Sequence, residues 1–172
     1  MFEINFEKII ARALEVNFCE QEARGMDSEY DRANLWSHIV IGAAIEVHRL
    51  KGPGLLESIY EKCLGHEFRL RDVPAISQVE VEIQYKGIKF SEFLKVDFYI
   101  DGCLLLELKA VERILPIHKA QLFSYMKLLS APIGLLINFH DATLQKGIHR
   151  MILPEIQSRS LQKKDKDSLH RT

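Results

Sequence analysis

Charged side chains interrupt two apolar stretches at residues 94–110, and this pattern constrains the fold more than any other feature of the sequence. The segment LKVDFYIDGCLLLELKA carries Asp97 in its first half and Glu107 and Lys109 in its second half. Burying a charge costs several kcal/mol unless the group is paired or bound to a metal. The fold must therefore bring these charged groups to partners.

The loop of the predicted hairpin decides which sheet face each charged residue occupies. A two-residue turn at 101–102 would put Asp97 on the face opposite Glu107. A three-residue loop at 100–102, with a left-handed Gly102 and a bulge, puts both carboxylates on one face. We predict the three-residue loop, because it separates the apolar positions from the charged ones. Its expected pairs are Tyr99 with Cys103 and Asp97 with Leu105, and its expected apolar face is Val96, Phe98, Leu104, Leu106 and Leu108.

The charged face of this hairpin fits a divalent-cation site. Asp97, Glu107 and a backbone carbonyl such as that of Leu108 offer the hard oxygen ligands that Mg²⁺ prefers, with water completing the shell. The ammonium of Lys109 could hold a scissile phosphate, lower the pKa of an attacking water or stabilise charge at phosphorus. The alternative is a plain ion pair on the strand face, because a Glu-x-Lys triplet alone is common.

The remaining sequence alternates between helical and extended patterns. Apolar residues at helical spacing predict helices at residues 4–18, 35–47, 55–71 and 117–130. Alternating or wholly apolar runs predict strands at 79–85, 88–100, 103–110 and 133–139, and an edge strand at 145–153. Because a helix separates the strands at 103–110 and 133–139, we expect these two strands to be parallel neighbours.

The length of 172 residues fits one domain with an appended segment. We divide the chain into an N-terminal helix and polar linker at 1–32, a core domain at 33–154 and a tail at 155–172. The tail has few apolar residues, so we expect it to be disordered.

Composition narrows the class of protein. The cysteines Cys19, Cys63 and Cys103 form no CxxC pair, which favours a reducing compartment and argues against a zinc finger. No apolar run is long enough to cross a membrane, and the N-terminus lacks the basic region of a signal peptide, so we expect a cytoplasmic protein. The formal net charge of −1 gives no sign of a nucleic-acid partner, although a neutral core can hold a local basic cleft.

Two predicted helices carry polar residues at spacings that share one helix face. Glu57 and Tyr60 lie three residues apart, and Gln121 and Tyr125 lie four apart. Simpler interpretations stand beside a functional one. An acidic residue such as Glu57 is favoured in the first turn of a helix, and both tyrosines fit as packing residues.

Three motifs occur in a characteristic order: GPGLLESIYE, VDFYIDGCLLLELKA and HKAQLFSYM. In this order they resemble the GxxExxY proteins, a branch of the PD-(D/E)XK nuclease-like superfamily, over about residues 33–153. Two positions depart from the pattern: Val96 replaces the proline of the eponymous pair, and Lys51 stands before GPG where the family has an apolar residue.

The resemblance implies a role for each polar residue of these motifs. Asp97 and Glu107 would bind the metal, and Lys109 would serve catalysis. The helical residues assigned to the catalytic site are Glu57 at its acidic position, and Gln121 and Tyr125 in a Q-x-x-x-Y motif.

These observations lead to one expected fold and two candidate functions. We expect an α/β fold with a restriction-endonuclease-like core, a mixed β-sheet flanked by helices, and an extra N-terminal helix. The expected activity is Mg²⁺- or Mn²⁺-dependent hydrolysis of phosphodiester bonds in nucleic acid, with DNA as the substrate. The alternative is a catalytically weak or inactive nuclease-fold module that binds nucleic acid or a protein. The N-terminal helix is a candidate contact for a homo-oligomer or a protein partner, and no membrane contact is expected.

Overall fold

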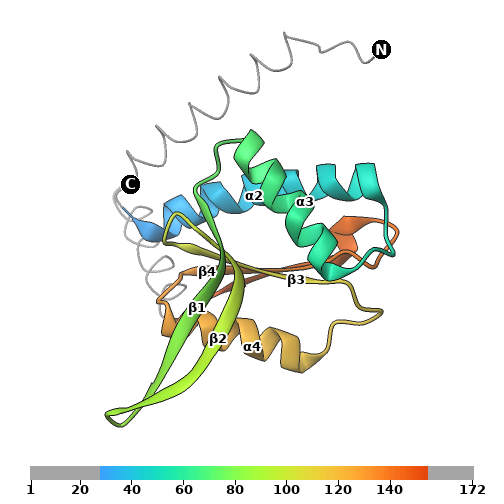
Figure 1. The fold of residues 1–172 in the computed structure, drawn as a ribbon. Helices are drawn as coiled ribbons and strands as arrows, with labels where there is room; N and C mark the ends of the chain where they lie inside the picture. Colours follow the sequence, from blue (N-terminus) through green and yellow to red (C-terminus); the bar gives the residue numbers. More distant parts are fainter. Residues whose placement is uncertain (1–27, 155–172) are drawn as a thin grey trace, which may run out of the picture.

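The computed structural model describes residues 28–154, so the helix predicted at 4–18 and the tail at 155–172 lie outside the described residues. Three α-helices, five strands and one 3-10 helix make up the described part (Figure 1). The helices are α2 (Glu29–Lys51), α3 (Glu57–Leu70), α4 (Pro116–Leu128) and the 3-10 helix η1 (Leu144–Gly147). The strands are β1 (Ala75–Tyr85), β2 (Ile88–Ile100), β3 (Leu104–Lys109), β4 (Ile133–Asn138) and β5 (Ile148–Ile152).

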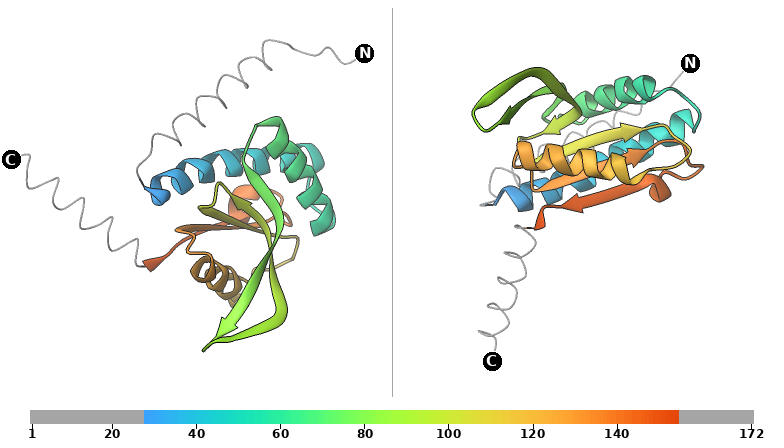
Figure 2. Two further views of the ribbon diagram at one scale, coloured as in Figure 1. Left: turned by 60° about the vertical axis from the view of Figure 1, so that its left-hand side comes forward. Right: turned by 90° about the horizontal axis from the view of Figure 1, so that it is seen from below.

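The strands form one mixed sheet in the order β1-β2-β3-β4-β5. Neighbouring strands are antiparallel except β3 and β4, which are parallel and joined through α4. Helices α2 and α3 lie on one side of the sheet and α4 lies on the other (Figures 1 and 2). The predicted mixed sheet flanked by helices is therefore confirmed, as is the parallel pair.

Two hydrophobic clusters fill the two sides of the sheet. The first cluster packs α2 and α3 against the sheet and includes Trp36, Tyr60 and Phe68. The second cluster lies on the α4 side and includes Leu122 and Met126. Strand β3 divides its leucines between them by alternation: Leu104, Leu106 and Leu108 belong to the first cluster and Leu105 to the second.

Helix α2 begins six residues earlier than the sequence predicts, inside the segment assigned to the polar linker. The side chain of Ser28 accepts a hydrogen bond from the Asp31 N–H at 3.1 Å and so caps the helix. Ala33 and Trp36 are fully or almost fully buried and extend the packed face toward this end. The linker pattern was misleading because a serine cap and acidic first-turn residues also look polar.

The hairpin between β2 and β3 has the predicted three-residue loop, but the loop is shifted by one position. Ile100 pairs with Leu104, so the loop comprises residues 101–103 rather than 100–102, and the expected pairs of Tyr99 with Cys103 and Asp97 with Leu105 are wrong. Both Asp101 (φ 48°) and Gly102 (φ 63°) are left-handed. The turn therefore closes with the Cys103 N–H donating to the Ile100 carbonyl at 3.0 Å. The odd loop length, which decides the sheet face, is retained.

Val96 does not share the face of Phe98, contrary to the prediction. Val96 belongs to the second cluster and Phe98 to the first. Strand β2 pairs with β3 only at its C-terminal end, over Phe98–Ile100. The preceding part of β2 pairs with β1 alone, and the two strands form an arm that projects from the sheet (Figure 1). The change of face occurs where β2 leaves β3, at the position of Asp97.

The end of η1 contacts the backbone at the end of β4. A β-carbon at Gly147 would overlap the carbonyl oxygen of Asn138. We predict that Gly147→Ala lowers the free energy of unfolding by about 1–3 kcal/mol in urea denaturation, as overpacking does elsewhere. The control is Gly42→Ala in α2, where the nearest atom to a new β-carbon is 3.7 Å away, and where alanine should be neutral or stabilising. Equal stability of the two variants would contradict the packing described.

Candidate functional site

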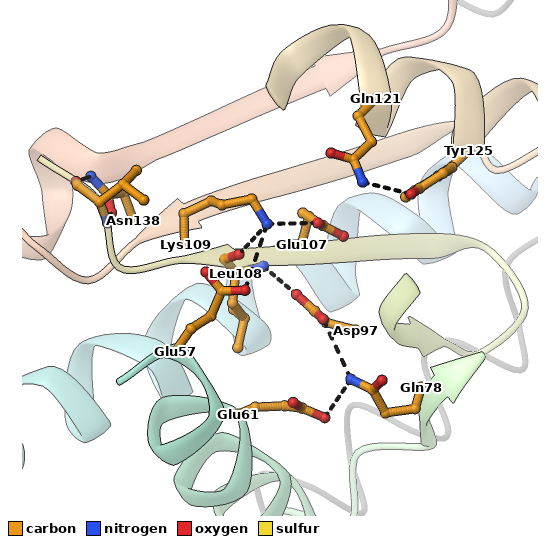
Figure 3. Close-up of polar contacts among 11 residues, drawn as sticks. Glu57, Glu61, Gln78, Asp97, Glu107, Leu108, Lys109, Gln121, Tyr125 and Asn138 are labelled. Carbon is orange, nitrogen blue, oxygen red and sulfur yellow. Dashed lines mark hydrogen bonds and ion pairs between the residues drawn. The ribbon is translucent and has the colours of Figure 1, made fainter. Parts of the chain in front are cut away.

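Strand β3 places Glu107 and Lys109 side by side on the sheet face that α4 covers. The Glu107 residue is 4% exposed. The Lys109 ammonium donates to Glu107 Oε1 at 2.8 Å and to the Leu108 carbonyl at 2.8 Å (Figure 3). The ion pair predicted as the simpler alternative is therefore present, and its location inside the fold distinguishes it from a surface pair.

Asp97 reaches the same site from β2. Its Oδ2 accepts the Leu108 N–H at 2.7 Å (Figure 3). Backbone pairing between β2 and β3 ends at Phe98 and Leu106, so the carboxylate takes over the next donor of the sheet. The structure brings Asp97 and Glu107 together with Lys109, as the odd loop requires.

Glu57 enters the site from the first residue of α3. Its Oε1 lies 3.7 Å from the Lys109 ammonium, and its side chain is 43% exposed. No side chain caps this helix, and the preceding Leu56 is the N-cap residue. Glu57 therefore fits both interpretations of its position: it is an acidic residue at the positive end of a helix, and its side chain also faces the site.

Tyr60 is a packing residue that fixes the loop before α3. It is fully buried, and its ring stacks on Phe139 with centroids 4.3 Å apart. Its hydroxyl donates to the Gly52 carbonyl at 2.6 Å and accepts the Leu55 N–H at 3.1 Å. Tyr60 thus holds the GPG loop in place and determines where Glu57 begins its helix.

Gln121 and Tyr125 lie on α4 above the sheet face that carries Glu107 (Figure 3). The Gln121 amide donates to the Tyr125 hydroxyl at 2.6 Å. Tyr125 is 4% exposed and belongs to the second cluster, so its ring packs while its hydroxyl stays with Gln121. The structure places both residues on the same side of the sheet as Lys109.

Burial and mutual repulsion change the ionisation of the site. Burial, followed by the charge of Asp97, raises the pKa of Glu107 to about 7 against the lowering effect of Lys109. Burial also raises the pKa of Asp97, against the lowering effect of its hydrogen bond from Leu108. Burial by itself lowers the pKa of Lys109, but its hydrogen bond to Glu107 and the nearby carboxylates outweigh that effect and raise it. The lysine is therefore an ammonium at neutral pH.

The donor set fits a divalent cation. Among the described residues, Glu107 Oε2 is buried without a hydrogen-bond partner, which is costly for a carboxylate oxygen. Asp97 and the Leu108 carbonyl offer further oxygens beside it, and hard oxygens of this kind suit Mg²⁺ or Mn²⁺. Within residues 28–154 no three His, Cys, Asp or Glu side chains form a metal-binding group. The candidate ligands are thus two carboxylates and a carbonyl.

Three further polar residues support the site and were not singled out from the sequence. Asn138 is 2% exposed; its amide donates to the Val111 carbonyl at 2.7 Å and accepts the Val111 N–H at 3.0 Å, which holds the chain just after Lys109. Its signal was a single amide in the apolar run 133–139. Glu61, one helical turn after Glu57, could also have been found by spacing. Gln78 gave no signal.

Comparison with known proteins assigns the family. A sequence model of the PD-(D/E)XK nuclease superfamily matches residues 34–151. The chain belongs to the PD-(D/E)XK nuclease superfamily. A search among curated proteins finds no match.

A solved structure titled "Crystal structure of SSO0001" is also similar, at 24% sequence identity and a TM-score of 0.46. The match covers 57% of this chain and 50% of that one, so this chain spans about half the length of the matched protein. No helix within residues 28–154 is long and apolar enough to span a lipid bilayer.

The raised pKa of Glu107 predicts a pH-dependent stability of the metal-free protein. A carboxyl whose pKa rises from 4.5 to about 7 on folding binds its proton more tightly in the folded state. Its stabilising contribution is complete below pH 4.5 and is lost as the pH rises toward 7. We predict that the unfolding free energy in chelator falls by up to about 3 kcal/mol over this window.

Glu107→Gln should remove most of this fall, as measured by urea denaturation at a series of pH values. The exposed Glu80→Gln on β1 serves as the control and should leave the fall unchanged. An identical pH profile for wild type and Glu107→Gln would show that Glu107 ionises normally.

Proposed function

We propose that the protein is a nuclease of the GxxExxY branch that hydrolyses phosphodiester bonds in nucleic acid, with DNA as the substrate and Mg²⁺ or Mn²⁺ as the cofactor. The observation that carries this proposal is the unpartnered, buried Oε2 of Glu107 beside Asp97 and Lys109. Asp97, Glu107 and the Leu108 carbonyl would hold the cation. When bound, the cation supplies Lewis acidity toward a phosphoryl oxygen and lowers the pKa of an attacking water.

Lys109 contributes a fixed positive charge to this reaction. Its hydrogen bond to Glu107 and the nearby carboxylates raise its pKa, so we assign it the role of an ammonium and not of a general base. A half-buried ammonium at this site can hold a phosphate oxygen and stabilise the negative charge that develops at phosphorus. Of the roles expected from the sequence, we therefore assign to Lys109 the binding of phosphate and the stabilisation of charge at phosphorus.

The helical residues border the same site on two sides. Glu57 adds a negative charge near Lys109 from the start of α3. On α4, the hydrogen bond between Gln121 and Tyr125 fixes the direction of two polar groups above β3. We assign these three residues to substrate contact and orientation, with Glu57 at the acidic helical position. We also assign the protein to the cytoplasm, where the free thiols of Cys63 and Cys103 would stay reduced.

A binding module without strong catalysis is the second candidate, and charge is the observation that favours it. The formal net charge is −1, and lysines of the β1–β2 arm are paired with acids, Lys95 with Glu80 and Lys89 with Glu82. Affinity for nucleic acid comes largely from phosphate neutralisation, so such a surface attracts it weakly. The meeting of Asp97, Glu107 and a half-buried Lys109 at one place favours the enzyme.

The test combines cleavage with cation binding. Wild type is incubated with linear, circular and single-stranded DNA and with RNA under Mg²⁺ or Mn²⁺, and Mn²⁺ binding is measured by calorimetry. We predict that Lys109→Met lowers the cleavage rate at least about 100-fold yet binds Mn²⁺ as tightly as wild type or more tightly. Asp97→Asn should lose both cleavage and most of the Mn²⁺ affinity.

Lys95→Met, on the same strand as Asp97 but exposed, is the matched control and should cleave normally. Equal cleavage by Lys109→Met and wild type would exclude this site as the source of activity. Failure of wild type to bind Mn²⁺, with and without a DNA fragment, would favour the binding module.

A further inference from the structure

Gln78 adopts a backbone conformation that is unusual inside a strand. Its φ of 52° is left-handed, which is unfavourable for a residue with a β-carbon. The other non-glycine residues with positive φ in the described part occupy turns: Asp72, Lys86, Asp101 and Ser130. Gln78 is instead within β1, opposite the place where β2 leaves β3.

The side chain of Gln78 bridges two carboxylates at the candidate site. Its amide nitrogen lies 2.8 Å from Glu61 Oε1 on α3 and 3.5 Å from Asp97 Oδ1 on β2 (Figure 3). The other oxygen of Asp97 is already bonded to the Leu108 N–H at 2.7 Å. The amide donors of Gln78 thus complete the support of the Asp97 carboxylate from the side opposite β3.

A neutral amide is well suited to this position. Asp97 and Glu61 repel each other, and an amide donates to both without competing with a cation for the site. Because the contact between Gln78 and Asp97 is long, the Oδ1 atom of Asp97 can still bind a cation. The contact with Glu61 also ties α3, which carries Glu57, to the edge of the sheet.

We propose that Gln78 is a positioning residue that orients Asp97 toward the divalent cation and fixes α3 relative to it. This role rests on the proposed function. A glycine would make the same backbone turn with less strain, so the turn alone does not account for a glutamine. The left-handed backbone directs the Gln78 amide between the carboxylates of Glu61 and Asp97.

The experiment separates the amide from the backbone by comparing Gln78→Ala with Gln78→Gly. Both remove the amide, but only glycine relieves the strain, so Gln78→Gly should melt at a higher temperature than Gln78→Ala. Groups that orient a metal ligand typically contribute 10–100-fold to metal affinity or activity. We expect both variants to bind Mn²⁺ about 10-fold more weakly in calorimetry. In cleavage assays, kcat should fall while KM stays close to the wild-type value.

Gln84→Ala is the matched control, since Gln84 is an exposed glutamine on the same strand, in the projecting arm. It should bind Mn²⁺ as wild type does. Wild-type Mn²⁺ affinity in both Gln78 variants would overturn the positioning role alone, and so would a loss in Gln78→Ala that Gln78→Gly restores. Absence of Mn²⁺ binding by wild type would overturn the proposed function and this role with it. Because glycine suits the observed φ, the test survives if Gln78→Ala fails to fold.

Discussion

The buried carboxylate of Glu107 is the constraint on which the site depends. Strand β3 lies in the middle of the sheet, with leucines packed on both faces, and Glu107 occupies one position of that strand. A carboxylate in such surroundings needs a partner for each oxygen. Lys109 satisfies Oε1, while Oε2 has no partner among the described residues. This unpaired oxygen lies where the fold brings several other oxygens that could bind a metal ion.

The Lys109 ammonium contacts two of the three groups that would hold the cation. Its ammonium binds both the Glu107 carboxylate and the Leu108 carbonyl, and it lies near Glu57. Two carboxylates about 4 Å apart repel by roughly 4 kcal/mol at an effective dielectric constant near 20, so a single ammonium offsets only part of the charge of three acids. Burial raises the pKa of Glu107, and the repulsion from Asp97 raises it further. In the proposed function, a divalent cation held by Asp97, Glu107 and the Leu108 carbonyl would relieve this repulsion, and the Lys109 ammonium would be available to contact the substrate.

Much of this arrangement could be predicted from the sequence because it follows from alternation. An odd loop puts Asp97 and Glu107 on one face wherever its three residues fall, so the shift from 100–102 to 101–103 did not matter. The position of the loop was not predictable from Gly102 alone, because Asp101 also adopts positive φ. Helix α4 and the parallel strands followed from their apolar patterns.

Other features depend on tertiary structure, and their roles could not be predicted from the local sequence. Val96 changes clusters because β2 departs from β3, which regular alternation does not reveal. Gln78 reaches the site only through a left-handed backbone that a strand pattern does not suggest. Asn138 acts through Val111, which lies far from it in the sequence. In each case the function of the residue depends on a partner that only the folded chain supplies.

The most direct test of the central claim is to locate the cation in a crystal of the wild-type protein grown with Mn²⁺, using its anomalous scattering. We predict one Mn²⁺ bonded to Glu107 Oε2, Asp97 and the Leu108 carbonyl at about 2.1 Å, the distance at which small hard cations bind oxygen. The Lys109 ammonium would no longer contact that carbonyl. A site without Mn²⁺, with the Lys109 ammonium still bonded to Leu108, would contradict the account.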